Sequence, residues 1–312
     1  MNVTPLHILT LYRHRNEVLW TNTELFIMRG FQQLIASVGI ESILGSSAWF
    51  SQALAINTLQ VYALGQVKLE NHGARINWLL PVNNSQSDPL PILLDNLAVE
   101  AGLHGAAFIT AAARVDDCLF KFLRHAGYSL YCWQAFWKLS KELQQPSNLH
   151  EVTWSKPDSL DAIEITLLQQ KLLSSAARSI LISAAESLPD FILRINGQLI
   201  GYARVTCFNN RVMIVPIFAR ESFDLKLVLT SLISEFFANA DKVFLLQSAD
   251  IGWLTDDLEK IASILAPREE LLVKHLTAMQ RIPKAELTPS ANGKRANPAT
   301  PMMPVSKHKD NI

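Results

Sequence analysis

The sequence of 312 residues contains few cysteines, no long apolar run and no excess of charge. Its three cysteines, Cys118, Cys132 and Cys207, have no C-x-x-C spacing. They therefore predict buried thiols in a reducing compartment rather than disulfides. No run of about eighteen uncharged apolar residues occurs, so we expect no transmembrane helix. Charged residues precede any long apolar run at the N-terminus, so we expect no signal peptide and a cytoplasmic protein.

The charge balance also excludes several kinds of partner. The chain has 28 Lys and Arg residues against 28 Asp and Glu residues, so its net charge is zero. No global field then favours nucleic acid or an anionic membrane, and we expect neither as a partner. The eight histidines are scattered without metal-ligand spacing, and no P-loop, G-x-S-x-G or H-E-x-x-H motif occurs. The sequence therefore predicts no metal site.

What is present is an apolar chain in which one order of elements occurs twice. Hydrophobic residues make up 49% of the chain and charged residues 18%, which is typical of a well-packed globular protein long enough for two domains. The first half predicts two strands in 6–20, a helix from Thr21–Glu24 to about Val38, and a hairpin of 58–69 with 74–82. These are followed by a helix from Pro91 to Gly102, a strand over 105–113, a helix capped by Asp116 and closed by Gly127, and a strand over 128–139.

The second half repeats this order after helical segments between about 160 and 187. The pattern predicts a hairpin over 191–205 turning at Asn196-Gly197, a strand over 211–219, a helix capped by Asp224, a strand over 242–247, a helix from Thr255 or Asp256, and a strand over 270–279. We therefore expect two domains, 1–140 and 160–282, joined by a linker over 141–159. The last residues, 283–312, hold five of the fourteen prolines and predict a disordered tail.

One segment carries a family resemblance. Residues 119–131, LFKFLRHAGYSLY, resemble the late helix-to-strand segment of GNAT-type acyl-CoA N-acyltransferases, and the order of elements in both halves is similar to that family. The resemblance implies an α/β (α+β) fold of two tandem GNAT-like domains, each a mixed, splayed sheet flanked by helices. It also implies acetyl-CoA as cofactor, bound in the splay with its pyrophosphate at the start of the central helix, and a small amine or a protein as acceptor.

The residues of the family's phosphate loop are mostly absent. A pyrophosphate needs several backbone N–H groups at a helix N-terminus and close backbone approach, and the family pattern is Arg/Gln-x-x-Gly-x-Gly/Ala. Only Arg220 fits this pattern among the six matching positions, which are Ser85, Asp88, Leu90, Arg220, Phe223 and Leu225. The family tyrosine that acts as general acid falls at Leu123, which cannot donate a proton, so no catalytic residue is identified.

The second half is the better candidate for a cofactor site. The resemblance places Val215, Arg220 and Ser222 along it, although Pro216 removes one backbone N–H. Arg220 would contact the ligand or form a surface ion pair. Two functions remain open: an acyl-CoA-dependent N-acetyltransferase with a degenerate phosphate-binding loop, or a catalytically inactive tandem GNAT-like module for binding or scaffolding.

Overall fold

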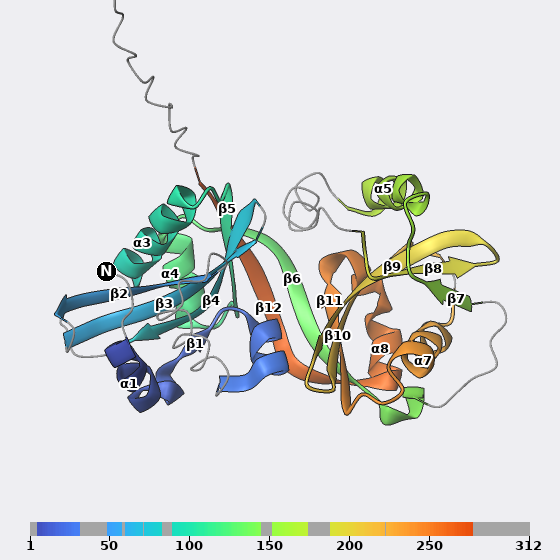
Figure 1. Ribbon diagram of the computed structural model, residues 1–312, viewed down its shortest axis with the longest axis horizontal. Helices are drawn as coiled ribbons and strands as arrows, with labels where there is room; N and C mark the ends of the chain where they lie inside the picture. Colours follow the sequence, from blue (N-terminus) through green and yellow to red (C-terminus); the bar gives the residue numbers. More distant parts are fainter. Residues whose placement is uncertain are drawn as a thin grey trace, which may run out of the picture. The chain divides into compact units, whose positions relative to one another are not determined.

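The computed structural model describes residues 5–31, 49–57, 60–70, 72–82, 89–144, 152–173, 188–221 and 223–276 (Figure 1). By their contacts, residues Met1–Met279 belong to one compact unit. The predicted tail, 283–312, lies outside the described residues. Among the described helices, none combines the length and the apolar character needed to cross a membrane.

The strands form one 12-stranded mixed sheet, which confirms the predicted α/β fold class. Its order is β2-β3-β4-β5-β12-β6-β11-β10-β9-β8-β7, and β1 pairs with β4 beside this path. The two pairs β4/β5 and β10/β11 are parallel, and the other described pairs are antiparallel. The strands are β1 (Leu19–Trp20), β2 (Trp49–Asn57), β3 (Gln60–Glu70), β4 (Gly73–Pro81), β5 (Phe108–Ala113), β6 (Ser129–Leu139), β7 (Val152–Ser155), β8 (Phe191–Ile195), β9 (Gln198–Phe208), β10 (Arg211–Phe218), β11 (Lys242–Ser248) and β12 (Ala262–His275).

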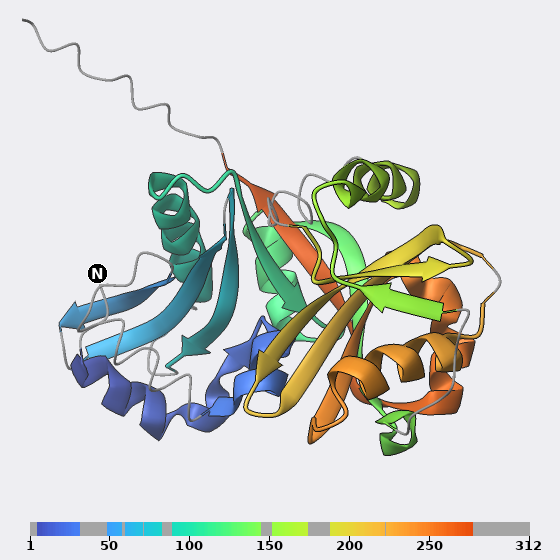
Figure 2. The ribbon, with the colours of Figure 1, turned by 45° about the vertical axis from the view of Figure 1, so that its right-hand side comes forward.

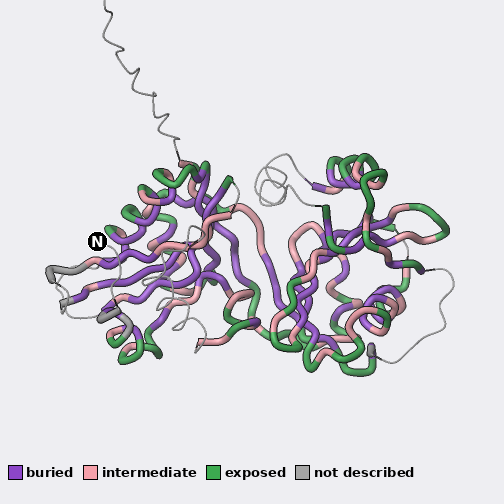
Figure 3. The backbone as a smooth tube through the Cα atoms, in the orientation of Figure 1, coloured by how far each residue is buried: buried purple, intermediate pink, exposed green. Residues whose placement is uncertain are grey.

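Helices cover both faces of the sheet. Helices α3 and α4 pack against β3, β4 and β5 around one core, and α7 and α8 lie over a second core built on β8 to β11. Figure 3 shows that the strands covered by these helices are largely buried. The helices are α1 (Pro5–Arg13), a helical stretch over 23–31, α3 (Leu90–Leu103), α4 (Cys118–His125), α5 (Asp161–Leu172), α7 (Leu225–Phe236) and α8 (Thr255–Ile261), with short 3-10 helices η1 (Arg15–Glu17), η2 (Lys141–Gln144) and η3 (Ala249–Leu254).

The two predicted halves exchange their last strands. In the sheet, β5 is followed by β12 and then β6, whereas β11 is followed by β6 and then β12. Strand β6 of the first half therefore pairs with β11 of the second, and β12 of the second half pairs with β5 of the first. Figure 2 shows β6 and β12 running side by side between the two groups of strands. The domain boundaries at 140 and 160 stay a prediction, because the hydrogen-bonded sheet runs across both halves.

Most predicted elements occur where the sequence placed them. The α3 face is buried as expected, at Leu93, Leu94, Leu97, Ala98 and Ala101. Asn196 and Gly197 have φ values of 50° and 79°, which are the positive angles that a tight hairpin turn requires.

Four expectations need correction. Residues 5–13 form helix α1 rather than a strand, because Pro5 suits a first helical turn and the buried His7 and Leu11 are four residues apart. Strand β7 lies inside the predicted linker, where its four residues pair with β8. Strand β2 lies in a segment for which the sequence pattern predicts no element. Asp117, not Asp116, caps α4: Leu119 N donates to its Oδ1 over 3.1 Å, and Asp116 pairs with Arg114.

Candidate functional site

The sheet opens at two places, one in each half, where two parallel strands diverge. Strands β4 and β5 pair only from Gly73 to Arg75, and β10 and β11 only from Arg211 to Ile214. Beyond these residues each pair separates, which creates the splay that the GNAT resemblance implies. We call them the N-terminal splay (Ile76–Pro81 with Ala111–Ala113) and the C-terminal splay (Val215–Phe218 with Leu246–Ser248).

The N-terminal splay is filled by the chain itself. Residues Leu19 and Trp20 form strand β1 and pair with Leu79 and Trp78 of β4. The next residue, Thr21, donates its N–H to Asn77 O over 3.2 Å and accepts the N–H of Ala112, on β5, over 2.9 Å. The backbone of 19–21 therefore bonds to both diverging strands, at the place where the resemblance puts the coenzyme.

A buried network of side chains holds this insertion. Asn22 donates through Nδ2 to Asn77 Oδ1 over 3.0 Å, and Asn77 donates through Nδ2 to Gln66 Oε1 over 3.2 Å. The hydroxyl of Thr21 donates to Ile76 O over 2.7 Å. The Asn22 Oδ1 also accepts the N–H of Leu25 over 3.1 Å, and so caps the helix over 23–31. All polar side chains of this network are buried, so each depends on its partners.

The C-terminal splay is closed by aromatic side chains. Phe218 ends β10, Phe223 precedes α7, and Trp253 lies in η3, which follows β11. The ring of Phe223 packs edge-on against Phe218, with centroids 5.4 Å apart, and against Trp253, with centroids 5.8 Å apart. This stack connects the end of β10 with the segment after β11. Phe223 thus occupies one of the glycine positions of the family loop and uses that space for packing.

The start of α7 is likewise occupied. The carboxylate of Asp224 accepts the N–H of Leu227 over 3.2 Å, so an acidic side chain caps the helix end that a pyrophosphate would need. Leu225, at the second glycine position, is a core residue with 2% exposure. The start of α3 offers few donors, because Pro89 and Pro91 both lack an N–H.

Two of the three predicted cofactor residues, Val215 and Arg220, lie in the described part of the chain. Val215 is the first β10 residue beyond the β11 pairing, and its half-buried side chain packs beside Met28 and Phe244. Arg220 is exposed in the connection from β10 to α7. Ser222 lies outside the described residues, as do Ser85 and Asp88 of the first half.

The remaining motif positions, Leu90 and Leu123, are core residues. That both halves have lost the glycine cradle stays a prediction, because Ser85 and Asp88 of the first half lie outside the described residues.

The ionisable groups of the interior are poorly suited to chemistry. Burial, together with the nearby carboxylates of Asp250 and Glu270, raises the pKa of the Cys132 thiol to about 12, so this thiol stays protonated at neutral pH. Cys118 and Cys207 are free but exposed, contrary to the expectation of buried thiols. Among the described residues, no group of three His, Cys, Asp or Glu side chains could hold a metal ion.

Sequence reasoning missed one buried carboxylate, Glu269 of β12. Its oxygens accept hydrogen bonds from Thr23 Oγ1 over 2.7 Å and from Gln134 Nε2. Burial raises the pKa of Glu269, and the two hydrogen bonds and Arg75 oppose that shift. Three strands and a helix distant in sequence meet here, so no local pattern could have revealed this site.

The comparisons with known proteins agree with the topology. No protein-family model and no curated relative matches the chain. A GCN5-related N-acetyltransferase from Sphaerobacter thermophilus is similar in structure, with a TM-score of 0.51 and 12% identity over 88% of this chain and 94% of that one.

The fold is of the GNAT type. A tandem GNAT protein from the clavulanic acid biosynthesis pathway has a TM-score of 0.43 and 13% identity over 73% of this chain and 83% of its own. A GNAT-family acetyltransferase from Colwellia psychrerythraea has a TM-score of 0.43 and 9% identity over 88% and 98%. At such identities the likeness describes the GNAT fold alone.

Proposed function

We propose that this chain is a non-catalytic binding module with a GNAT fold, in which neither splay holds acyl-CoA. The observation that carries the proposal is the hydrogen bonding of residues 19–21 to both β4 and β5. A coenzyme could enter the N-terminal splay only by replacing these backbone bonds and by removing the Asn22 side chain that donates to the buried Asn77 Oδ1. An unpaired buried polar group costs about 1–3 kcal/mol, so this displacement is strongly opposed.

The C-terminal splay supports the same proposal on different grounds. The stack of Phe218, Phe223 and Trp253 fills the space beside the start of α7. The Asp224 carboxylate would also repel a diphosphate, since like charges at close range disfavour each other. The free cysteines support a cytoplasmic location for the module.

A second candidate is an acyl-CoA-dependent N-acyltransferase that uses only the C-terminal splay. It is favoured by the backbone of β10 from Val215 onward, which pairs with β9 but not with β11. Acetyl-CoA could bond to this edge, with Arg220 near its phosphates and a small amine or a protein as acceptor. Pro216 removes one donor from the same edge.

Titration with acetyl-CoA separates the two candidates. A ligand with a Kd of about 10 µM, present at about 1 mM, would stabilise the protein by about 2.7 kcal/mol. We expect no such stabilisation that depends on Arg220, and no release of free CoA with amine acceptors. Acetyl-CoA binding that Arg220→Ala abolishes, together with CoA release, would refute the binding-module proposal and support the acyltransferase.

A further inference from the structure

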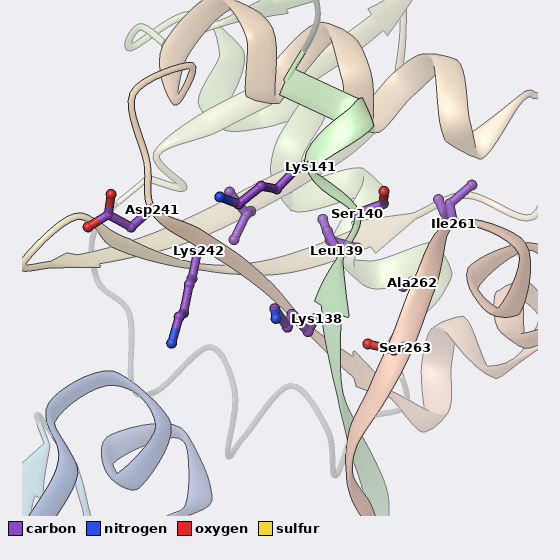
Figure 4. A pocket seen from close by; sticks show the side chains of 10 residues that line it. Lys138, Leu139, Ser140, Lys141, Asp241, Lys242, Ile261, Ala262 and Ser263 are labelled. Carbon is purple, nitrogen blue, oxygen red and sulfur yellow. The ribbon is translucent and has the colours of Figure 1, made fainter.

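A cavity of about 620 Å³ lies far from both splays, where β6 ends and where β11 and β12 begin (Figure 4). Two backbone hydrogen bonds brace its walls. Ser140 N donates to Ile261 O over 3.1 Å, and Asp241 N donates to Asn210 O over 2.8 Å. The cavity thus has walls from five elements: β6, η2, β11, α8 and β12. Its lining residues are Lys138, Leu139, Ser140, Lys141, Asp241, Lys242, Val243, Ile261, Ala262 and Ser263.

The cavity is lined by three ammonium groups from three elements. Lys138 lies on β6, Lys141 on η2 and Lys242 on β11 (Figure 4). The β6/β11 register pairs Lys138 with Phe244, so Lys138 and Lys242 lie on the same face of the sheet. No ion pair joins any of these three lysines to a residue that the structure describes. Asp241 is the one acidic residue among the described residues of the lining, which together carry a net positive charge.

A second, adjoining cavity extends this charge. It has a volume of about 280 Å³, shares Asp241 and Lys242, and adds Arg29 and Arg211 to the lining. Arg211 is the register partner of Lys242 in the parallel β10/β11 pair. Together, five cationic residues and one acidic residue are found among the described residues that line the two cavities, on a protein whose total charge is zero. Arg211 also donates to Ile27 O over 2.8 Å, and the Arg29 guanidinium lies over the ring of Phe208. A local field of this kind concentrates anions.

The rest of the lining indicates an organic anion. Ile261 and Ala262, both half-buried, add apolar surface to the lining, and the hydroxyls of Ser140 and Ser263 can donate hydrogen bonds. A volume of this size is typical of small-molecule sites. Lysine binds phosphate as a point charge, and several lysines suit several phosphoryl groups.

We infer that this cavity binds a small organic ligand that carries two or three phosphoryl groups. This inference rests on the proposed binding role and deepens it by naming the ligand class. The site is separate from the acyl-CoA position, because β11 starts at the cavity and reaches the C-terminal splay at its other end, about 13–20 Å along the strand.

The test is calorimetric titration of the full chain with ATP and with inorganic tripolyphosphate. We expect one site per chain for both probes, with Kd values that rise with salt concentration. Lys138→Gln and Lys242→Gln should each weaken binding about tenfold, since each removes a charge-assisted contact. Asp241→Asn should tighten binding roughly threefold, because it removes the carboxylate.

Lys121→Gln is the matched control, since Lys121 is an exposed lysine on α4. Its binding should equal that of the unaltered protein. An equal loss in this control, or no heat from either probe at millimolar concentration, would overturn the inference. So would tighter binding of a single-stranded oligonucleotide with the same dependence on Lys138 and Lys242, because the surface would then be a nucleic-acid track.

Acetyl-CoA carries phosphates and therefore distinguishes this inference from the proposed function. Binding that Lys138→Gln abolishes and Arg220→Ala leaves intact locates acetyl-CoA in the lysine cavity and supports both proposals. Acetyl-CoA binding that Arg220→Ala abolishes and Lys138→Gln leaves intact would refute the proposal that the C-terminal splay holds no acyl-CoA. The titrations with ATP and tripolyphosphate would then still test, separately, whether the lysine cavity binds phosphoryl groups.

Discussion

At the scale of single residues, the interior contains carboxylate and amide groups whose partners come from distant parts of the chain. Glu269 is 6% exposed and bonds to Thr23, which is 246 positions away in sequence. Burial raises its pKa, so the folded protein keeps the Glu269 proton to a higher pH than the unfolded chain does. The free energy of unfolding should therefore fall as the pH rises above the ordinary value of 4.5 and through the folded-state pKa.

The substitution Glu269→Gln tests this linkage. Glutamine is neutral at every pH and can keep both hydrogen-bond partners, so the variant should gain stability relative to the unaltered protein as the pH rises from about 4.5 to about 8. Urea unfolding at several pH values measures the difference. Parallel stability profiles for the two proteins would show that Glu269 does not titrate differently on folding.

The Asn22 network gives a second prediction at this scale. Asn22→Ala removes the donor of the buried Asn77 Oδ1 and the acceptor of the Leu25 N–H, so we expect a loss of about 1–3 kcal/mol in the free energy of unfolding. Asn96→Ala, on the exposed side of α3, is the control and should change stability by less than about 0.5 kcal/mol. Chemical denaturation of both variants measures the difference, and equal effects would contradict the role of the network.

At the scale of elements, the sequence predicts what local patterns determine. The α3 stripe of leucines and alanines, the Asn196-Gly197 turn and the all-buried β5 each follow from residues next to one another in sequence. Strand β2 was not predicted, because its buried positions Ser51 and Gln52 are polar and conceal the apolar pattern. Strand β1 is only two residues long, and its pairing with β4 depends on a gap that exists only in the folded sheet.

Two glycines in these elements should respond oppositely to alanine. A Cβ at Gly201 of β9 would meet Phe218 Cδ1 at 2.5 Å and Ile217 O at 2.7 Å, so Gly201→Ala should cost roughly 1–3 kcal/mol. A Cβ at Gly102 of α3 meets nothing within 4 Å, and Gly102→Ala should stabilise the helix by about 0.5–1 kcal/mol. Thermal unfolding checks both signs, and a stabilised Gly201→Ala would contradict the close packing of β9 against β10.

At the scale of the whole molecule, the repeated order of elements predicts two similar halves but not their exchange of strands. Each half has its own helices and its own splay, yet β12 separates β5 from β6, and β6 separates β11 from β12. The hydrophobic pattern determines which residues of a strand are buried, but it does not determine which strand pairs with which. The candidate site was predictable to the same degree: the absence of glycine at the motif positions is visible in the sequence, whereas the bonding of residues 19–21 to β4 and β5 is not.

The exchange predicts that the two halves fold only together. A fragment of residues 1–144 contains β5 and β6 without the strand that separates them, so it should lack a cooperative thermal transition. Co-expression with residues 145–282 should restore a complex that unfolds in one step. Calorimetry and co-purification measure this, and a cooperative transition in the isolated 1–144 fragment would contradict it.

Strand β12 is the last strand of the sheet along the chain, and this order affects how the chain can fold while it is being synthesised. While the chain is made from its N-terminus, β5 and β6 each expose a hydrogen-bonding edge until residues 262–275 emerge. The nascent first half must therefore wait for the last strand, and its open edges are the surfaces that a chaperone would need to shield from other chains.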